Sequence, residues 1–226
     1  MLFSEPPFVV AITGASGAIY AIRLVEVLLH VGRDVHLMVS RPGQLVLKHE
    51  LNLAVDLDNF DVASLGIDPQ KAPSDSSLAM TRSFAGVASD DSSVLPSGSR
   101  DPGKITYYHF DDLMAPIASG SYITAGMVIC PCSQSTLSAV AHAAGSNLIH
   151  RAADVHLKEH RKLIVVPRET PLSIAQLDNM RRVCEIGAVV LPAMPGWYHG
   201  VTEIRDLVDF VVARILDHLD VRHSLI

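Results

Sequence analysis

Cysteine and tryptophan are both scarce in this chain of 226 residues, which has 3 Cys and 1 Trp. A small, odd number of cysteines does not build a disulfide scaffold, and Cys130, Cys132 and Cys184 lack partners at the spacing of a zinc site. We therefore expect reduced thiols in a cytoplasmic protein without a bound metal. In this interpretation Cys130 and Cys132 belong to the packed end of a strand.

The sequence also lacks a basic excess and a long apolar run. The formal net charge is -6, which argues against general nucleic-acid binding, because that function needs a large basic surface. No uninterrupted apolar run reaches the roughly 18 residues of a membrane-spanning helix, so we expect no membrane span. The start, MLFSEPPFVV, has no basic segment and no long apolar core, so we expect no signal peptide.

The chain is 49% hydrophobic, and its apolar residues alternate between strand-like and helix-like patterns. This alternation predicts an α/β protein with a doubly wound parallel sheet. The length fits one domain over residues 1–226. Residues 63–103 differ, because they are rich in Ser, Pro and Gly, and we expect a flexible low-complexity insertion there. Residues 201–220 predict an amphipathic helix with Ile204 on its inward stripe and Arg214 off it.

A glycine-containing turn follows the first expected strand, residues 8–13, and opens a helix. It reads Gly14-Ala15-Ser16-Gly17, so Ser16 stands where a dinucleotide fingerprint has its second glycine, and the third glycine is missing. The next expected strand ends in Ser40 and a basic residue rather than in the acidic residue that holds a ribose diol. These differences favour a mononucleotide or flavin phosphate site over an NAD site. The alternative is a tight turn without a ligand.

The stretch of residues 127–171 has the pattern of a strand, a helix and a second strand. The first strand ends in small polar residues at 131–136, and the second ends in Pro167-Arg168-Glu169-Thr170. A right-handed crossover would make the two strands parallel neighbours. Both polar turns would then lie at the carboxyl ends of the strands, where open α/β sheets bind ligands.

Positive charge gathers in the same stretch. Residues 151–168 carry Asp154 and Glu159 against five basic residues, which are Arg151, Lys158, Arg161, Lys162 and Arg168. Hydroxyl and N–H groups at a helix start, together with such cations, predict an anion site that suits phosphate. The alternative is a solvated basic helix face beside a Ser/Thr cap. Residues 119–121, Ser-Gly-Ser, offer donors for a second anion.

The ordered set of short motifs resembles the UbiX/Pad family of flavin prenyltransferases. The resemblance spans nearly the whole chain apart from residues 63–103, and it depends on the set rather than on any single motif. The motifs are 13–18 (TGASGA), 114–116 (MAP), 118–121 (ASGS), 130–133 (CPCS), 136–138 (TLS), 147–149 (NLI), 151–155 (RAADV), 157–159 (LKE), 167–171 (PRETP), 179–180 (NM), 195–198 (PGWY) and 206–210 (DLVDF).

The resemblance implies a flavodoxin-like or Rossmann-like three-layer αβα subunit that assembles as a homo-oligomer, a dodecamer in this family. It implies a metal-independent transferase that joins the dimethylallyl group of dimethylallyl monophosphate to N5 and C6 of reduced FMN and releases phosphate. The prenylated FMN would serve a UbiD-type decarboxylase, for example in ubiquinone biosynthesis.

Residue roles follow from the same resemblance. The positions that match FMN contacts are Gly14, Ala15, Ser16, Ser40, Ser133, Gln134, Ser135, Thr136 and Arg168. The positions that match the site of the prenyl phosphate are Ser119, Arg151, Lys158, Arg168, Tyr198 and Arg214. The matching catalytic residues are Ser16 and Glu50, which would move a proton near the flavin, and Glu169, which would protonate the departing phosphate.

Three other functions fit parts of the sequence. A flavin-dependent cysteine decarboxylase shares the expected fold, but its Pro-Ala-Ser-x-Asn-Thr run lacks the Asn at residues 131–136, and His49 does not stand in the context of its catalytic histidine. A non-catalytic flavin-binding partner protein would not need the charged residues that this chain retains. An NADP reductase is supported by Arg41 alone.

The chain departs from the family pattern at three places. Residues 63–103 are an insertion, and Leu113 stands where some members have Trp. The sequence ends at Ile226, whereas some members continue in a tail with a Trp that covers the site. We expect these differences to change the closure of the site and the rate of product release rather than the class of reaction.

Overall fold

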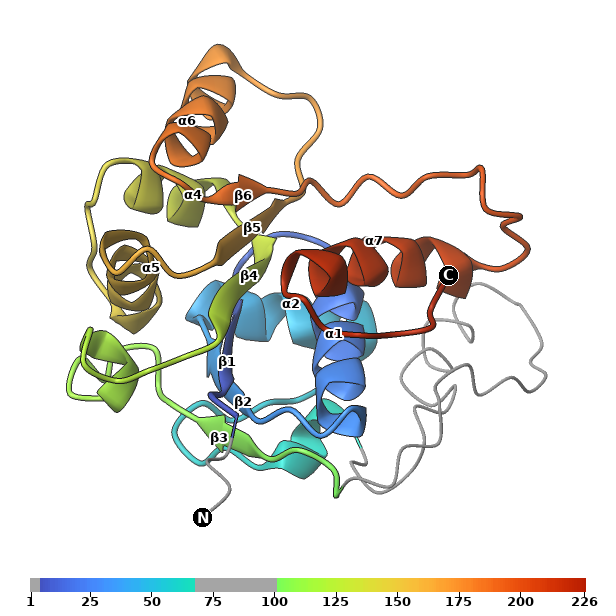
Figure 1. Ribbon diagram of the computed structural model, residues 1–226, viewed down its shortest axis with the longest axis horizontal. Coiled ribbons are helices and arrows are strands. Elements are labelled where there is room, and N and C mark those ends of the chain that lie inside the picture. Colours follow the sequence, from blue (N-terminus) through green and yellow to red (C-terminus); the bar gives the residue numbers. More distant parts are fainter. Residues whose placement is uncertain (1–4, 68–100) are drawn as a thin grey trace.

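Six parallel strands form the central sheet of the computed structural model, which describes residues 5–67 and 101–226. Their order along the sheet is β3-β2-β1-β4-β5-β6 (Figure 1). The predicted doubly wound α/β fold is confirmed, and the strand order, which the sequence left open, is that of a Rossmann-type sheet. The strands are β1 (Phe8–Ile12), β2 (Val35–Val39), β3 (Ile105–Tyr107), β4 (Gly126–Cys132), β5 (Leu163–Pro167) and β6 (Val189–Val190).

The four central strands, β1, β2, β4 and β5, are fully buried. Parallel strands with helices on both faces have no solvent side, which explains why these strands are nearly continuous apolar runs. The strand order reverses between β1 and β4, since β2 and β3 extend to one side and β5 and β6 to the other. Such a switch point leaves a crevice at the carboxyl ends of the strands.

Helices cover both faces of the sheet in the predicted three layers (Figure 1). On one face α1 (Ala18–His30) packs against both α2 (Arg41–Leu51) and α7 (Ile204–His218). On the opposite face lie α4 (Gln134–Ala141), α5 (Leu148–Lys158) and α6 (Ile174–Glu185). A side chain on α5 and a side chain on α7 are therefore separated by the sheet.

Small polar residues fix where most helices begin. Ser40, Ser133, Asn147 and Ser173 each precede a helix and accept a hydrogen bond from a backbone N–H group of its first turn. The Asn147 cap accounts for one difference from the prediction. The crossover from β4 to β5 contains two helices rather than one, because α4 ends at Ala141 and the chain restarts a helix after the cap.

The expected insertion, residues 63–103, is described only at its two ends. Its start overlaps the short 3-10 helix η1 (Val62–Leu65), where Leu65 is completely buried, so this part packs on the core. At the other end, a Cβ on Gly103 would collide with the backbone of Arg33. Residues 68–100 lie outside the described residues. Within the ranges that are described, no helix is both long and apolar enough to cross a membrane.

The last helix differs from the prediction at its first residue and at Asp209. Ile204 was expected to point inward, but its side chain is 46% exposed. Asp209 is instead only 5% exposed, because its carboxylate pairs with Arg23 of α1. Asp209 thereby joins the inward stripe of α7, on which Val208, Val211 and Ile215 are also buried.

Candidate active site

The carboxyl ends of β1 and β4 are tied together by the side chain of Thr13. Its Oγ1 donates to the carbonyl oxygen of Pro131 at 2.8 Å and accepts from the N–H group of Ser133, also at 2.8 Å. A β-bulge between Ile129 and Cys132 interrupts the pairing of β4 with β5 at the same place. The two turns predicted to bind a ligand therefore start side by side at the switch point of the sheet.

The turn after β1 is shaped by close contacts of its backbone. A Cβ on Gly14 would collide with the side chain of Pro42, so this turn needs glycine to approach the start of α2. Gly17 precedes α1 with a φ of 111°, a conformation that residues with a side chain rarely adopt. These two glycines set the path of the chain, and Ser16 supplies the hydroxyl group of the turn.

Glu50 of α2 caps the N-terminus of α1. Its carboxylate accepts hydrogen bonds from the N–H groups of Gly17, at 2.9 Å, and of Ala18, at 3.0 Å. These are the N–H groups that a nucleotide-binding fold offers to phosphate at this helix. In this structure a carboxylate of the chain accepts from both groups, and the interpretation of the turn as a flavin phosphate site stays a prediction.

Ser16 and Glu50 line one open hollow of about 500 Å³, next to residues 45–49 of α2. Arg168, which follows β5, reaches the same turn, since its Nε donates to the carbonyl oxygen of Ser16 at 3.2 Å. Three predicted site residues thus converge from separate parts of the chain. A hydroxyl beside a carboxylate can relay a proton, and a guanidinium group can hold an anion.

The turn before α4 supplies further polar groups. The Oγ of Ser133 accepts from the N–H group of Thr136 at 3.3 Å and bonds the hydroxyl groups of Ser135 and Thr136. Gln134 differs, because both polar atoms of its amide are buried and lack a partner within the described part of the chain. An amide offers a donor and an acceptor, which suits the N–H and C=O groups of a flavin ring. The residues of this turn therefore fit FMN.

Ser40 brings the end of a third strand to the same edge of the sheet. It follows β2, its N–H group donates to the carbonyl oxygen of Ile12 at 3.0 Å, and its Oγ accepts from Gly43 at 3.1 Å. A Cβ on Gly43 would collide with the Ile12 carbonyl oxygen, so α2 begins in close contact with β1. All the residues predicted to bind FMN follow β1, β2, β4 or β5, and we call this region the flavin edge.

Arg151, Lys158 and Ser119 form a second group, which we call the α5 set. Arg151 is on α5, and its Nε donates to the carbonyl oxygen of Ala118 at 3.0 Å, next to Ser119. Its Nη1 pairs with Asp154 at 2.9 Å. Arg151 and Lys158 are seven residues apart, so they share a face of the helix.

The far end of α5 places Lys158 away from Arg168. Lys158 pairs with Glu159 at 3.2 Å, and a Cβ on Gly120 would collide with the same carboxylate. β5 runs between Lys158 and Arg168 with its five residues, a length of roughly 16 Å. The structure therefore divides the basic residues that the sequence suggested as one anion site.

Tyr198 and Arg214 form a third group, the α7 set. Tyr198 is 84% exposed, and its ring meets the ring of Phe210 edge to face at 5.7 Å between centroids. Arg214 pairs with Asp217 at 2.6 Å on the surface of α7. Glu169 lies apart from both sets, because it follows Arg168 at the flavin edge, where its carboxylate accepts from the next backbone N–H group at 3.1 Å.

Sequence reasoning did not single out Thr13 or Tyr20 as site residues. Tyr20 lies in the first turn of α1, three residues after Gly17. Its place beside the glycine turn could have marked it as a site residue. Burial raises the pKa of Tyr20, and Cys130 raises it further, whereas Arg168 lowers it, so the phenol stays a hydrogen-bond donor. Burial also raises the pKa of Cys130 well above its ordinary value, which leaves this thiol unreactive.

Comparisons with known proteins show the family to which the chain belongs. The Flavoprotein family model matches residues 3–216. A flavin prenyltransferase UbiX from Pseudomonas aeruginosa is 44% identical over 216 residues, which cover 96% of this chain and 90% of that protein. The structure of AnUbiX (PadA1) in complex with FMN and dimethylallyl pyrophosphate is similar with a TM-score of 0.72 and 31% identity, over 96% of this chain and 93% of the other. A dodecameric FMN-dependent UbiX-like decarboxylase from Escherichia coli O157:H7 has a TM-score of 0.72 and 29% identity, over 96% of both chains.

The Rossmann-type sheet, the polar turns at its switch point and the family match define the chain as a flavoprotein. Peptidyl-cysteine decarboxylase EpiD shares only the fold, with 12% identity and a TM-score of 0.53. Within the flavoproteins, this chain belongs to the UbiX family of flavin prenyltransferases. The family predicted from the sequence is thereby confirmed.

Proposed function

We propose that this chain is a flavin prenyltransferase that joins a dimethylallyl group to reduced FMN and releases phosphate. The observation that carries the proposal is the convergence of Ser16, Glu50 and Arg168 at the flavin edge, beside the buried amide of Gln134. The relative AnUbiX supports it, because its crystal structure contains both FMN and a dimethylallyl compound.

The flavin, when bound, supplies the nucleophilic nitrogen and carbon atoms, and the residues of this chain hold it and move protons. The turn at residues 133–136 and Ser40 orient the flavin. Glu50 is held by the N–H groups of Gly17 and Ala18, so its carboxylate keeps one position beside Ser16. In that position it accepts, through the hydroxyl of Ser16, the proton that ring closure releases.

The departing phosphate needs positive charge and a proton. Arg168 supplies a guanidinium group at the flavin edge, and Glu169, the next residue, supplies a carboxyl group that would protonate the phosphate. The α5 set adds Arg151 and Lys158, and the α7 set adds Arg214 with the phenol of Tyr198. Charged donors that face the leaving oxygen atoms lower the barrier as negative charge develops on them.

The site requires a second copy of the chain. The α5 helix carries Arg151 and Lys158, the α7 helix carries Arg214, and the two helices cover opposite faces of the sheet (Figure 1). One chain therefore cannot close both sets around one phosphate. A neighbouring copy would bring its α5 set to the α7 set and the flavin edge of the first. Exposed apolar side chains near these sets, such as Leu113, Met114 and Trp197, suit an interface. We propose a dodecamer, the assembly that the E. coli relative has.

The proposed donor is dimethylallyl monophosphate. The AnUbiX structure contains the pyrophosphate instead, so both donors must be compared. The proposed product is prenylated FMN, which would be taken up by a UbiD-type decarboxylase in the cytoplasm.

An anaerobic assay tests the proposed function. The protein is mixed with FMN, a reductant, EDTA and either dimethylallyl monophosphate or the pyrophosphate. The mass of the released flavin is then measured by mass spectrometry. We expect a gain of one C5H8 unit with the monophosphate. Unmodified flavin from a protein that still binds FMN would contradict the proposal and favour a flavin-binding partner protein. Oxidative decarboxylation of a peptide with a C-terminal Cys would instead favour the cysteine decarboxylase.

A further inference from the structure

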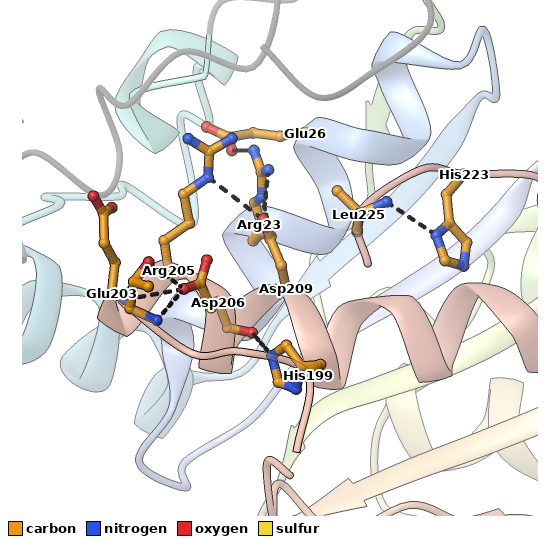
Figure 2. A network of polar contacts seen from close by, with 10 residues as sticks. Arg23, Glu26, His199, Glu203, Arg205, Asp206, Asp209, His223 and Leu225 are labelled. Atoms are coloured by element: carbon orange, nitrogen blue, oxygen red, sulfur yellow. Dashed lines mark hydrogen bonds and ion pairs between the residues drawn. The ribbon is translucent and has the colours of Figure 1, made fainter. Parts of the chain in front are cut away.

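A cluster of four charged side chains, three of them buried, joins α1 to α7 (Figure 2). Arg23 and Asp209 are its centre, with Nε–Oδ1 at 2.7 Å and Nη2–Oδ2 at 3.1 Å, a two-pronged contact. Arg23 also contacts Glu26 at 3.5 Å, and Arg205 contacts Asp209 at 3.4 Å. Arg23 is 2% exposed and Asp209 is 5% exposed, so the central pair is held away from water.

Stability alone does not explain this pair. Removing two charges from water costs about as much as their attraction returns, and buried ion pairs are often replaced by apolar residues without loss of stability. A guanidinium and a carboxylate that meet through two parallel hydrogen bonds do fix direction, because neither can rotate without losing a bond. The pair therefore sets the rotation and the register of α7 on α1.

Each of the two helices leads to a part of the proposed site. α1 begins directly after the Ser16–Gly17 step, so it is attached to the flavin edge. α7 carries Arg214, and the residue after Asp209 is Phe210, whose ring supports the loop that contains Tyr198. The central pair thus lies between the residues proposed to hold the flavin and those proposed to hold the donor phosphate.

The loop before α7 is fastened to this helix by ring contacts and by hydrogen bonds. The ring of His199 stacks on Phe210 at 5.1 Å, and the ring of Tyr198 meets both of these rings edge to face. A Cβ on Gly196 would lie 2.8 Å from the Tyr198 ring and 3.0 Å from Phe210, so glycine permits this packing. The carboxylate of Asp206 accepts from two backbone N–H groups of the loop, at 2.7 and 2.9 Å. A rotation of α7 would therefore carry Tyr198 with it.

We propose that Arg23 and Asp209 are positioning residues for the donor phosphate: their buried pair fixes α7, and with it Arg214 and the Tyr198 loop, relative to the flavin edge. This inference rests on the proposed function for its kinetic consequence. Its structural consequence, a fixed Tyr198 loop, stands without that function and has its own probe. Trp197, adjacent to Tyr198, is the single tryptophan of the chain.

The test replaces the pair by apolar residues of similar volume, Arg23→Met with Asp209→Leu. We expect a melting temperature equal to or above that of the unchanged protein, and an unchanged Kd for FMN. We expect the KM for dimethylallyl monophosphate to rise at least tenfold, since displacing a binding group by about 1 Å has effects of this order. The fluorescence anisotropy of Trp197, measured without flavin, should fall. Arg23→Lys keeps the charge without the two-pronged contact and should show the same KM change in smaller degree.

Two further variants make the result decisive. Arg181→Gln with Glu185→Gln removes an exposed pair on α6, 2.7 Å long, and should change neither KM nor anisotropy. Phe210→Leu leaves the ion pair in place and should reproduce the KM and anisotropy changes, which covers the case in which the double variant does not fold. Unchanged KM and unchanged anisotropy in a folded double variant, or in Phe210→Leu, would overturn the proposal. If the unchanged protein makes no prenylated flavin, the proposed function fails, and the anisotropy still decides the positioning role.

Discussion

The flavin edge and the two phosphate-binding sets differ in how far a single chain completes them. At the flavin edge, Thr13, Glu50 and Arg168 each bond the backbone of an element far away in the sequence. In the α5 and α7 sets, Arg151 and Arg214 are about half exposed and pair with carboxylates three residues along the same helix. The first region is built inside the chain, and the second consists of surfaces that a neighbouring copy would complete in the proposed assembly.

This difference predicts the order in which the flavin and the phosphate donor bind. The bond of Thr13 is buried and that of Glu50 is partly buried, and such bonds between distant elements are lost only if the fold changes, so this part of the flavin edge is preformed. Exposed ion pairs on a helix contribute only about 0.3–0.5 kcal/mol each, so a phosphate can displace their carboxylates at little cost. We therefore expect the flavin to bind first and the cations of the two sets to exchange their partners for the phosphate.

The largest expected effect belongs to Glu50→Gln at the flavin edge. Glutamine keeps an oxygen that can accept from Gly17 and Ala18, but it cannot take up a proton. We expect turnover to fall by about 10²–10⁴-fold, the usual contribution of a positioned base, with the Kd for FMN unchanged. Product formation and FMN titration measure the two quantities. Full turnover by this variant would remove Glu50 from proton transfer.

Acid pH should lower the free energy of unfolding through a buried histidine of α5, the helix that carries Arg151 and Lys158. His156 of α5 is buried, with Nε2 at 2.8 Å from the Oγ1 of Thr124, and burial lowers its pKa from 6.5 to about 4. A hydrogen bond to the carbonyl of Ala152 opposes this shift, and Arg161 adds to it. Between these pKa values the unfolded chain binds a proton that the folded chain does not bind. The free energy of unfolding should therefore fall by about 3 kcal/mol between pH 7 and pH 4 through this group.

Urea unfolding at several pH values measures this dependence, with His156→Gln as the comparison. The variant should lose the part of the pH dependence that His156 contributes. An identical pH dependence in the two proteins would show that the pKa of His156 is the same in the folded and unfolded chains and that the assigned burial effect is wrong.

The two regions should also differ, by a smaller amount, in how much they contribute to the free energy of unfolding. Thr13→Ala leaves the N–H group of Ser133 without its partner and removes one of the two hydrogen bonds that the buried Pro131 carbonyl accepts. It should therefore cost about 1–3 kcal/mol of the free energy of unfolding and weaken FMN binding. Arg151→Ala removes an exposed pair and should cost less than about 1 kcal/mol, with loss of activity only. Urea unfolding of both variants measures this contrast. Equal costs would mean that the α5 set is as firmly built into the fold as the flavin edge.

The sequence predicts the fold and the meeting of the polar turns at one edge of the sheet, because both follow from local patterns. Apolar runs that end in polar turns mark parallel strands, and parallel strands place their carboxyl ends at one edge, so Ser16 and Arg168 could be expected to meet. The role of Glu50 as the cap of α1 could not be predicted. It depends on how α2 packs against α1, and a single glutamate on a helix gives no sign of such a contact.

The basic stretch at residues 151–168 shows a case in which closeness in sequence was misleading. Its residues are close in sequence, which suggested one anion site, but a helix and a strand carry Lys158 and Arg168 to different places. The inward stripe of α7 was misjudged at Ile204 for a related reason. Hydrophobic periodicity does not predict that an aspartate will be buried, because its partner, Arg23, is 186 residues away in the sequence.

Complementation between inactive variants tests the central contrast most directly. Lys158→Ala and Arg214→Ala chains are expressed separately and together, and prenylated flavin is measured. If one site takes Lys158 and Arg214 from different copies, random mixing restores both residues in about a quarter of the sites. Glu50→Gln with Arg168→Ala should restore nothing, because both residues belong to one chain. Recovery by the first pair alone is the predicted result, and no recovery by that pair from a correctly assembled oligomer would contradict the account.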